Sequence, residues 1–191
     1  KLMFPDDQNL LNIDIDHIQK ILELKDFLKT CRISRIFPST LLVEVIENEP
    51  IAVLQKIDES YILDENGSKL PLNKRAISYF NLPVIQLGQF SIYGNERNKV
   101  NLETFSEILS GLKTNYTEIF SDIQSLNFIG GGDVIIQFGR KTRIFANEQY
   151  LDEHFRYLDE FRKTQSLHHV LSNYSTIDLR VDNQIIVKKR T

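Results

Sequence analysis

The chain has 191 residues, of which 41% are hydrophobic and 26% charged, and its formal net charge is −3. This composition is typical of a folded protein, and the length suits either one large domain or two small ones. The negative net charge argues against a nucleic-acid partner, because binding to phosphates needs a basic face. We therefore expect a folded protein that has no nucleic-acid partner.

The first predicted elements are a short helix and two strands. Asp14 or Asp16 can cap a helix that ends near Lys25, because apolar residues recur there at helical spacing. Residues 33–37 are rich in β-branched and aromatic side chains, and residues 41–46 alternate with the period of a half-buried strand. About 50 residues rarely support a core alone, so this unit either lacks a part or packs on the next part of the chain.

The stretch Glu47-Asn48-Glu49-Pro50 breaks this alternation and predicts a boundary between two units. After it, the pair Asn66-Gly67 favours a tight turn between two strands. The strands expected in this part of the chain are residues 51–57, 61–63, 68–72 and 83–87, followed by a polar connection over residues 88–99.

The rest of the chain predicts two longer helices and a second set of strands. Asn101 and Asn147 can each cap a helix that has one apolar face, and residues 130–133 predict a turn. The predicted buried face of the second helix consists of Leu151, Phe155 and Leu158, widened by Tyr150, Tyr157 and Phe161. The predicted fold class is therefore α+β, with a helix on a small sheet followed by a larger mixed β part in which two main helices pack on an extended sheet. The strands expected here are residues 123–129, 134–138, 142–146, 176–181 and 185–188.

Cysteine and histidine side chains do not occur in the spacing of a metal site. Cys31 is the only cysteine and begins an apolar strand pattern, so we expect a small buried side chain there. His168 and His169 are adjacent and point apart in regular structure, while His154 lies upstream of them. We expect no metal and no cofactor.

The residue patterns of an enzyme are missing as well. A phosphate loop needs a following helix, whereas Asp133 and a predicted strand follow the glycines of residues 130–132. Asp178 and Arg180 share a face of a predicted strand, either as an exposed ion pair or as part of a polar recognition face. Because no nucleophile–base pair or pair of carboxylates has a usable spacing, we predict that the protein is not an enzyme.

The last pair of predicted strands favours an interaction role. Residues 176–188 alternate between apolar and polar side chains and close the sequence. A terminal strand often lies at a sheet edge, where its backbone groups can pair with a partner strand. The alternative is that the protein itself covers this edge.

Six short stretches of the sequence carry a resemblance to a known family. They are Arg35-Ile36-Phe37-Pro38-Ser39-Thr40-Leu41, Val43-Glu44-Val45, Glu47-x-Glu49-Pro50-Ile51-Ala52, Leu63-Asp64-x-x-Gly67, Leu82-Pro83 and Ile177-Asp178-Leu179-Arg180-Val181-Asp182-Asn183. In this order they resemble the extracytoplasmic region of the bacterial cell-division family FtsQ, called DivIB in Gram-positive species. The ordered set covers most of the chain.

The resemblance implies two domains outside the cytoplasmic membrane. Residues 1–48 would form a POTRA (polypeptide-transport-associated) domain that lacks its first strand and helix. Residues 49–191 would form a β domain of the FtsQ/DivIB type. A single transmembrane helix, absent from this chain, would anchor both domains on the extracytoplasmic side of the membrane at the division septum.

The resemblance also implies partners and binding residues. The family is a non-enzymatic scaffold of the division machinery that binds FtsB (DivIC in Gram-positive species) and FtsL, helps control septal peptidoglycan synthesis, and uses its POTRA part for recruitment. Its partner adds a segment to the edge of the terminal strands. Val181 stands where the family often has Tyr, and Lys189 lies near where some members carry a Trp. On this sequence the partner-binding residues would be Arg180, Val181, Asp182, Asn183, Ile185 and Val187.

Two other functions remain as alternatives. One is a POTRA module of an outer-membrane assembly or secretion protein that binds substrate strands, although such proteins usually carry several POTRA repeats and this chain shows one partial copy. The other is a hydrolase or metal enzyme, which would need a deep pocket lined by His154, His168 or Asp178 with shifted pKa values.

Overall fold

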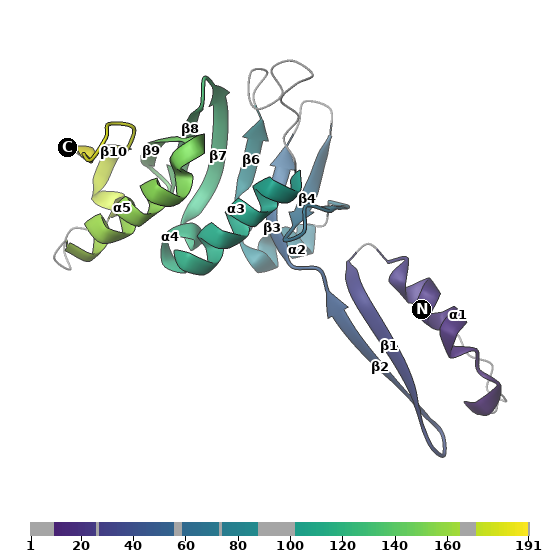
Figure 1. The fold of residues 1–191 in the computed structure, drawn as a ribbon. Coiled ribbons are helices and arrows are strands. Elements are labelled where there is room, and N and C mark those ends of the chain that lie inside the picture. The colour runs from purple at the N-terminus through teal and green to yellow at the C-terminus, as the bar shows by residue number, and fades with distance from the viewer. Residues whose placement is uncertain are drawn as a thin grey trace. The chain divides into compact units, whose positions relative to one another are not determined.

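The computed structural model describes residues 10–25, 27–55, 59–72, 74–87, 102–164 and 171–190. The chain divides into two compact units, Lys1–Glu49 and Pro50–Thr191 (Figure 1). The boundary expected from the sequence lies one residue earlier, and the assignment of each unit to a domain type stays a prediction. The expected connection over residues 88–99, the Asn101 cap and His168-His169 lie outside the described residues.

The small unit contains a helix and a two-stranded antiparallel sheet. Asp14 is the residue that caps the helix, because its Oδ1 accepts a hydrogen bond from the backbone N–H of His17 at 2.9 Å. The other candidate, Asp16, lies inside the first turn of the helix. The elements are η1 Leu10–Asn12, α1 Ile15–Glu23, β1 Leu28–Ile36 and β2 Thr40–Glu47.

The core of the small unit lies between α1 and β1. Ile18, Cys31 and Ile33 are buried there, with Ile15 and Leu22 packed against them. This confirms the small buried side chain that was predicted at Cys31. Burial raises the pKa of the Cys31 thiol, and the nearby Glu23 carboxylate raises it further, so the thiol is held in its protonated form.

Strand β2 is much more exposed than its alternating sequence predicts. Leu42, Val43, Val45 and Ile46 have 41–58% of their surface exposed. The described helix α1 packs mainly against β1, and Leu41 is the β2 residue that packs against the buried cluster of this unit. The prediction of a strand at these residues was correct, but the prediction that it is half-buried was wrong.

The large unit is built on a mixed sheet of nine described strands (Figure 1). In chain order they are β3 Pro50–Gln55, β4 Ser60–Asp64, β5 Lys69–Leu70, β6 Val84–Leu87, β7 Ile123–Gly130, β8 Asp133–Phe138, β9 Thr142–Asn147, β10 Tyr174–Asp178 and β11 Ile186–Lys189. Their order across the sheet is β11-β10-β9-β8-β7-β6-β3-β4-β5. The pairs β3–β6, β6–β7 and β9–β10 are parallel, and the other described neighbours are antiparallel.

Two main helices, α3 Leu102–Asn115 and α5 Leu151–Thr164, lie along one face of this sheet (Figure 1). This confirms the predicted α+β class. Asn147 caps the single turn η2 Glu148–Tyr150 that leads into α5, since its Oδ1 accepts from the N–H of Gln149 at 3.0 Å. Among the described residues, none of the helices combines the length and the apolar character needed to cross a membrane.

Four short helical segments were not predicted: η1 Leu10–Asn12, α2 Lys74–Phe80, α4 Thr117–Ser121 and η3 Leu171–Asn173. Each is at most two turns long, which is too short for a helical period to stand out in the sequence.

The core of the large unit lies between the two main helices and the sheet. On α5, the predicted buried positions Leu151, Phe155 and Leu158 are buried, and Phe161 packs against the core, whereas Tyr150 is exposed. The buried side chains of the sheet that meet these helices come from alternate positions of neighbouring strands, as the period of two requires. They include Leu126, Phe128, Val134, Ile136, Ile144 and Ile177.

The glycine-rich stretch is a hairpin turn between β7 and β8. Gly131 and Gly132 have φ values of +67° and +85°, a left-handed conformation that disfavours side chains. Asp133 begins β8 directly after them. The predicted turn is thus confirmed, and the stretch does not lead into a helix that could bind phosphate.

We predict that the α3 core controls the stability of the large unit. Replacing the fully buried Leu109 by Ala should lower the free energy of unfolding by about 2–5 kcal/mol, because the cavity left behind cannot fully collapse. Replacing Ile108 by Ala, at a position with 39% exposure on the same helix, should cost less than about 1 kcal/mol. Urea unfolding measures both, and equal losses would contradict the placement of this helix.

Candidate functional site

Strand β11 forms one edge of the nine-stranded sheet. It pairs with β10 on one side only, within the part of the chain that the structure describes. All four of its residues are exposed, Ile186 to 51% and Val187 to 36%. The sequence-based expectation that the terminal strand lies at an edge is therefore met, and no described segment covers it.

The outward-facing backbone groups of β11 can be identified. The N–H of Arg190 donates to the carbonyl of Asn173, and the carbonyl of Lys188 accepts from Ser175 Oγ, so residues 188 and 190 point their backbone groups toward β10. In an antiparallel strand, the backbone N–H and C=O groups of successive residues point alternately toward one neighbour and away from it. The N–H and C=O of Val187 and Lys189 therefore face away from the sheet, where a partner strand can pair with them.

The side chains of this strand divide between the two faces of the sheet. Val187 lies opposite the buried Ile177, on the face that carries α5, while Ile186 lies opposite Asp178 on the other face. Ile185, just before the strand, packs against the core on the α5 side. An added strand would thus place alternate side chains against α5 and against the open face.

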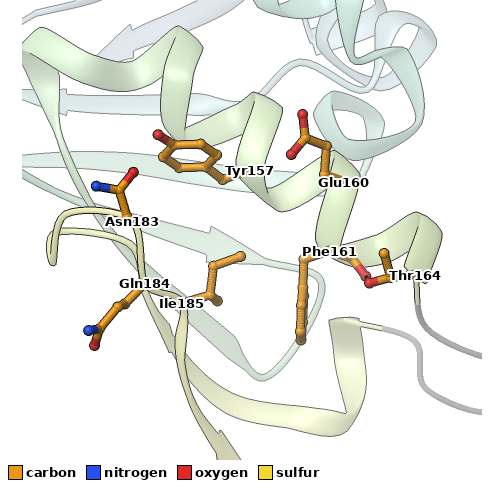
Figure 2. Close-up of a pocket in the computed structure, with 7 residues that line it drawn as sticks. All are labelled: Tyr157, Glu160, Phe161, Thr164, Asn183, Gln184 and Ile185. Atoms are coloured by element: carbon orange, nitrogen blue, oxygen red, sulfur yellow. Dashed lines mark hydrogen bonds between the residues drawn. The ribbon is translucent and has the colours of Figure 1, made fainter.

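A groove runs between α5 and the segment that connects β10 to β11 (Figure 2). One part has a volume of about 340 Å³, with Tyr157 and Phe161 on the helix side and Ile185 opposite them. A second part, of about 310 Å³, shares Tyr157 and Asn183 with the first and so continues it. The other lining residues of the second part are Asn147, Tyr150, Glu153, His154, Leu179, Arg180, Val181 and Asp182.

Arg180 is the centre of a polar cluster at the second part of the groove. Its guanidinium donates to both carboxylate oxygens of Asp178, at 2.9 and 2.7 Å, and to Asp133 at 2.7 Å. Its cationic carbon also lies 5.1 Å from the centre of the Phe145 ring, a favourable cation–π distance. These bonds lower the pKa of Asp178 and raise that of Arg180. Asp178 and Arg180 thus form the ion pair that the sequence offered as one interpretation, and Arg180 also lines the groove.

His154 is a buried member of the same wall, with 7% of its surface exposed. Its Nδ1 accepts a hydrogen bond from the backbone N–H of Asn147 at 3.2 Å. Burial lowers the pKa of His154, and the carboxylates of Glu153 and Asp178 partly oppose this effect. No group of three metal-ligating side chains occurs among the described residues.

The structure brings the six sequence-predicted binding residues to one end of the sheet. Arg180, Val181, Asp182 and Asn183 line the second part of the groove, Asn183 and Ile185 line the first, and Val187 lies on the edge strand. The helical wall of the groove was not predicted as part of the site, because Tyr157 and Phe161 were assigned only to the buried face of α5. The missed residues are Tyr157, Glu160, Phe161, Thr164 and Ile186, and His154 was considered only for the enzyme alternative.

The relatives found by comparison with known proteins are cell division proteins named FtsQ. No family model matches the chain. The chain is 25% identical over 182 residues to the cell division protein FtsQ of Rickettsia prowazekii, covering 94% of this chain and 61% of that protein. It is 26% identical over 183 residues to FtsQ of Rickettsia bellii, covering 95% and 62%. The chain therefore spans about three fifths of the length of these relatives.

A shorter match and one solved structure complete the comparisons. The chain is 37% identical over 60 residues to FtsQ of Myxococcus fulvus, covering 31% of this chain and 21% of that protein. The extracytoplasmic domain of the bacterial cell-division protein DivIB of Geobacillus stearothermophilus aligns with a TM-score of 0.42 and 13% identity, over 63% of this chain and 99% of that one.

We predict that Arg180 controls the titration of Asp178. Replacing Arg180 by Ala removes the main cause of the lowered pKa, so the pKa of Asp178 should rise toward the ordinary value of about 3.9. Because a lowered carboxyl pKa stabilises the fold above its unfolded-state value, the stability lost in the variant should be greatest near neutral pH and shrink as the pH falls below about 4. Carboxyl NMR titration and unfolding at several pH values measure the two effects.

The matched control is Arg156→Ala, on the exposed face of α5. Arg156 forms ion pairs with Glu153 and Glu160, whereas the pKa of Asp178 is lowered by Arg180 and, more weakly, by His154. This variant should leave the pKa of Asp178 unchanged. An equal shift of that pKa in both variants would show that Arg180 has no special role.

Proposed function

Because the chain belongs to the FtsQ/DivIB family of cell-division proteins, we propose that it is a non-enzymatic scaffold of the division machinery that binds a partner strand along β11. The observation that carries this proposal is the open edge of β11, whose outward N–H and C=O groups at Val187 and Lys189 are free of the β10 ladder. Unpaired edge groups are the feature that strand addition uses.

The groove beside β11 supports the same proposal. A partner strand paired with β11 would pass along the segment from residue 180 to residue 185, next to α5. Tyr157, Phe161 and Ile185 offer apolar surface to a side chain of the partner (Figure 2). Binding would then combine backbone pairing with a specific side-chain contact, as strand addition does elsewhere.

We propose partners of the FtsB (DivIC) and FtsL kind, and through them a role in the control of septal peptidoglycan synthesis. We further propose that Lys1–Glu49 is part of a POTRA domain used for recruitment, and that the longer protein is anchored in the cytoplasmic membrane with this region on its extracytoplasmic side. The relatives carry the name of a cell division protein and not the name of an enzyme activity, which supports a scaffolding role.

We predict that Val187→Pro weakens the partner without unfolding the sheet. Proline removes the outward N–H of residue 187, and an edge strand tolerates proline where that N–H is not used inside the sheet. The loss should be about 2 kcal/mol, or roughly 30-fold in affinity, as for an interface hot spot. The measurement is the amount of FtsB-type partner that co-purifies with the membrane-anchored full-length protein.

Val187→Ala is the control, because it shortens the same side chain and keeps the N–H. It should retain most of the partner, and both variants should keep the circular dichroism spectrum and unfolding midpoint of a folded β domain. Undiminished co-purification with a folded Val187→Pro variant would rule out backbone pairing along β11.

A further inference from the structure

One buried histidine lies in the wall of the groove, and the proposed function gives it no role. His154 belongs to α5, with 7% of its surface exposed, and faces the part of the groove lined by Arg180 and Val181. His17, the other described histidine, is exposed on α1. An imidazole can change its charge near physiological pH, so a buried histidine in the wall of a groove is a candidate for a pH-sensitive group.

The hydrogen bond of His154 joins α5 to the sheet. The backbone N–H of Asn147, the last residue of β9, donates to Nδ1 at 3.2 Å. The same residue caps the turn into α5 through its Oδ1, and the next N–H, of Glu148, donates to the carbonyl of Gly132 at 2.8 Å. The imidazole therefore bonds to the junction where the chain leaves the sheet and enters the helix.

This bond exists only while Nδ1 carries no proton. The protonated imidazole has an N–H at both ring nitrogens and no acceptor. Its Nδ1–H would then face the N–H of Asn147, so two donors would meet and the bond would be lost. Protonation thus acts on the start of α5, the helix that supplies Tyr157, Glu160, Phe161 and Thr164 to the groove.

Charged and titratable groups surround His154 on several elements. Glu153 is on α5 itself, Asp178 is on β10, and both favour the imidazolium. The guanidinium of Arg180 lies on the same wall and is held by Asp178 and Asp133. Burial outweighs the carboxylates and keeps the pKa of His154 below its ordinary value. The other titratable neighbours are Glu148 beside Asn147, and Tyr150, Tyr157 and Asp182 along the groove.

The sign of the pH effect follows from this lowered pKa. A histidine whose folded-state pKa is lowered binds its proton more weakly in the folded state than in the open one. The bonded arrangement is therefore fully favoured above the unfolded-state value of about 6.5 and loses its advantage as the pH falls below it.

We propose that His154 makes the groove beside β11 sensitive to pH, because protonation of Nδ1 releases the start of α5 from the end of β9 and weakens partner binding. This inference rests on the proposed function of the β11 edge. It makes partner binding strongest at neutral pH and weaker under acidic conditions.

The test compares the wild-type chain with His154→Asn, whose Oδ1 can occupy the place of Nδ1 as an acceptor that does not titrate. The protection of the Asn147 amide against hydrogen exchange, corrected for the intrinsic pH dependence, should fall about fivefold in the wild type between pH 7.5 and 5.0, as expected for one lost hydrogen bond. It should stay constant in His154→Asn. His17→Asn is the control and should behave like the wild type.

Retention of the FtsB-type partner by the full-length protein should fall with the same pH profile in the wild type and not in His154→Asn. An Asn147 amide with unchanged protection in the wild type, or equal pH profiles in the wild type and His154→Asn, would overturn the inference. A partner that binds equally at both pH values would overturn it as well. Absence of partner at pH 7.5 would instead contradict the binding role of β11, whereas the amide measurement decides the role of His154 without a partner.

Discussion

Strand β10 pairs with β9 in parallel and with β11 in antiparallel orientation, so it links the exposed edge to the buried sheet. Two parallel strands cannot be joined by a hairpin and need a crossover, which here contains α5. The buried hydroxyl of Thr142 fixes the pairing, because it donates to the carbonyl of Tyr174 at 2.8 Å. The position of α5 beside the edge strand is therefore a consequence of this parallel pair.

Polar contacts extend this arrangement beyond the end of β10. The N–H of Leu179 still donates to the carbonyl of Phe145, and Arg180 then bonds to Asp178 and Asp133. Exposed ion pairs contribute little to stability, so the cluster matters more for position than for energy. It holds the segment after β10 against the sheet before the turn at Asn183, whose φ of 57° is left-handed. The segment that forms this wall of the groove is therefore held by the Arg180 cluster at one end and by the turn at Asn183 at the other.

Local patterns in the sequence were enough to predict most strands, both main helices and the edge position of the last strand. Alternation in residues 134–138 and the glycines before Asp133 are signals that depend only on neighbours in the chain. The groove could not be predicted in this way, because Tyr157 and Asn183 are brought together by the crossover. Likewise, the exposure of Val43 depends on what packs against β2, and the alternation of the strand's own residues does not reveal this.

An open edge is a hazard for a folded domain, since unpaired strands can associate without specificity. β11 is short, with four residues, and two of them, Lys188 and Lys189, carry charge, which discourages pairing with a second copy of the same edge. Its apolar residues, Ile186 and Val187, lie at the end nearer the groove. A partner that can use the groove gains contacts there which a random strand does not. The lysines of β11 and the groove beside it thus allow the open edge to favour a specific partner strand over other strands.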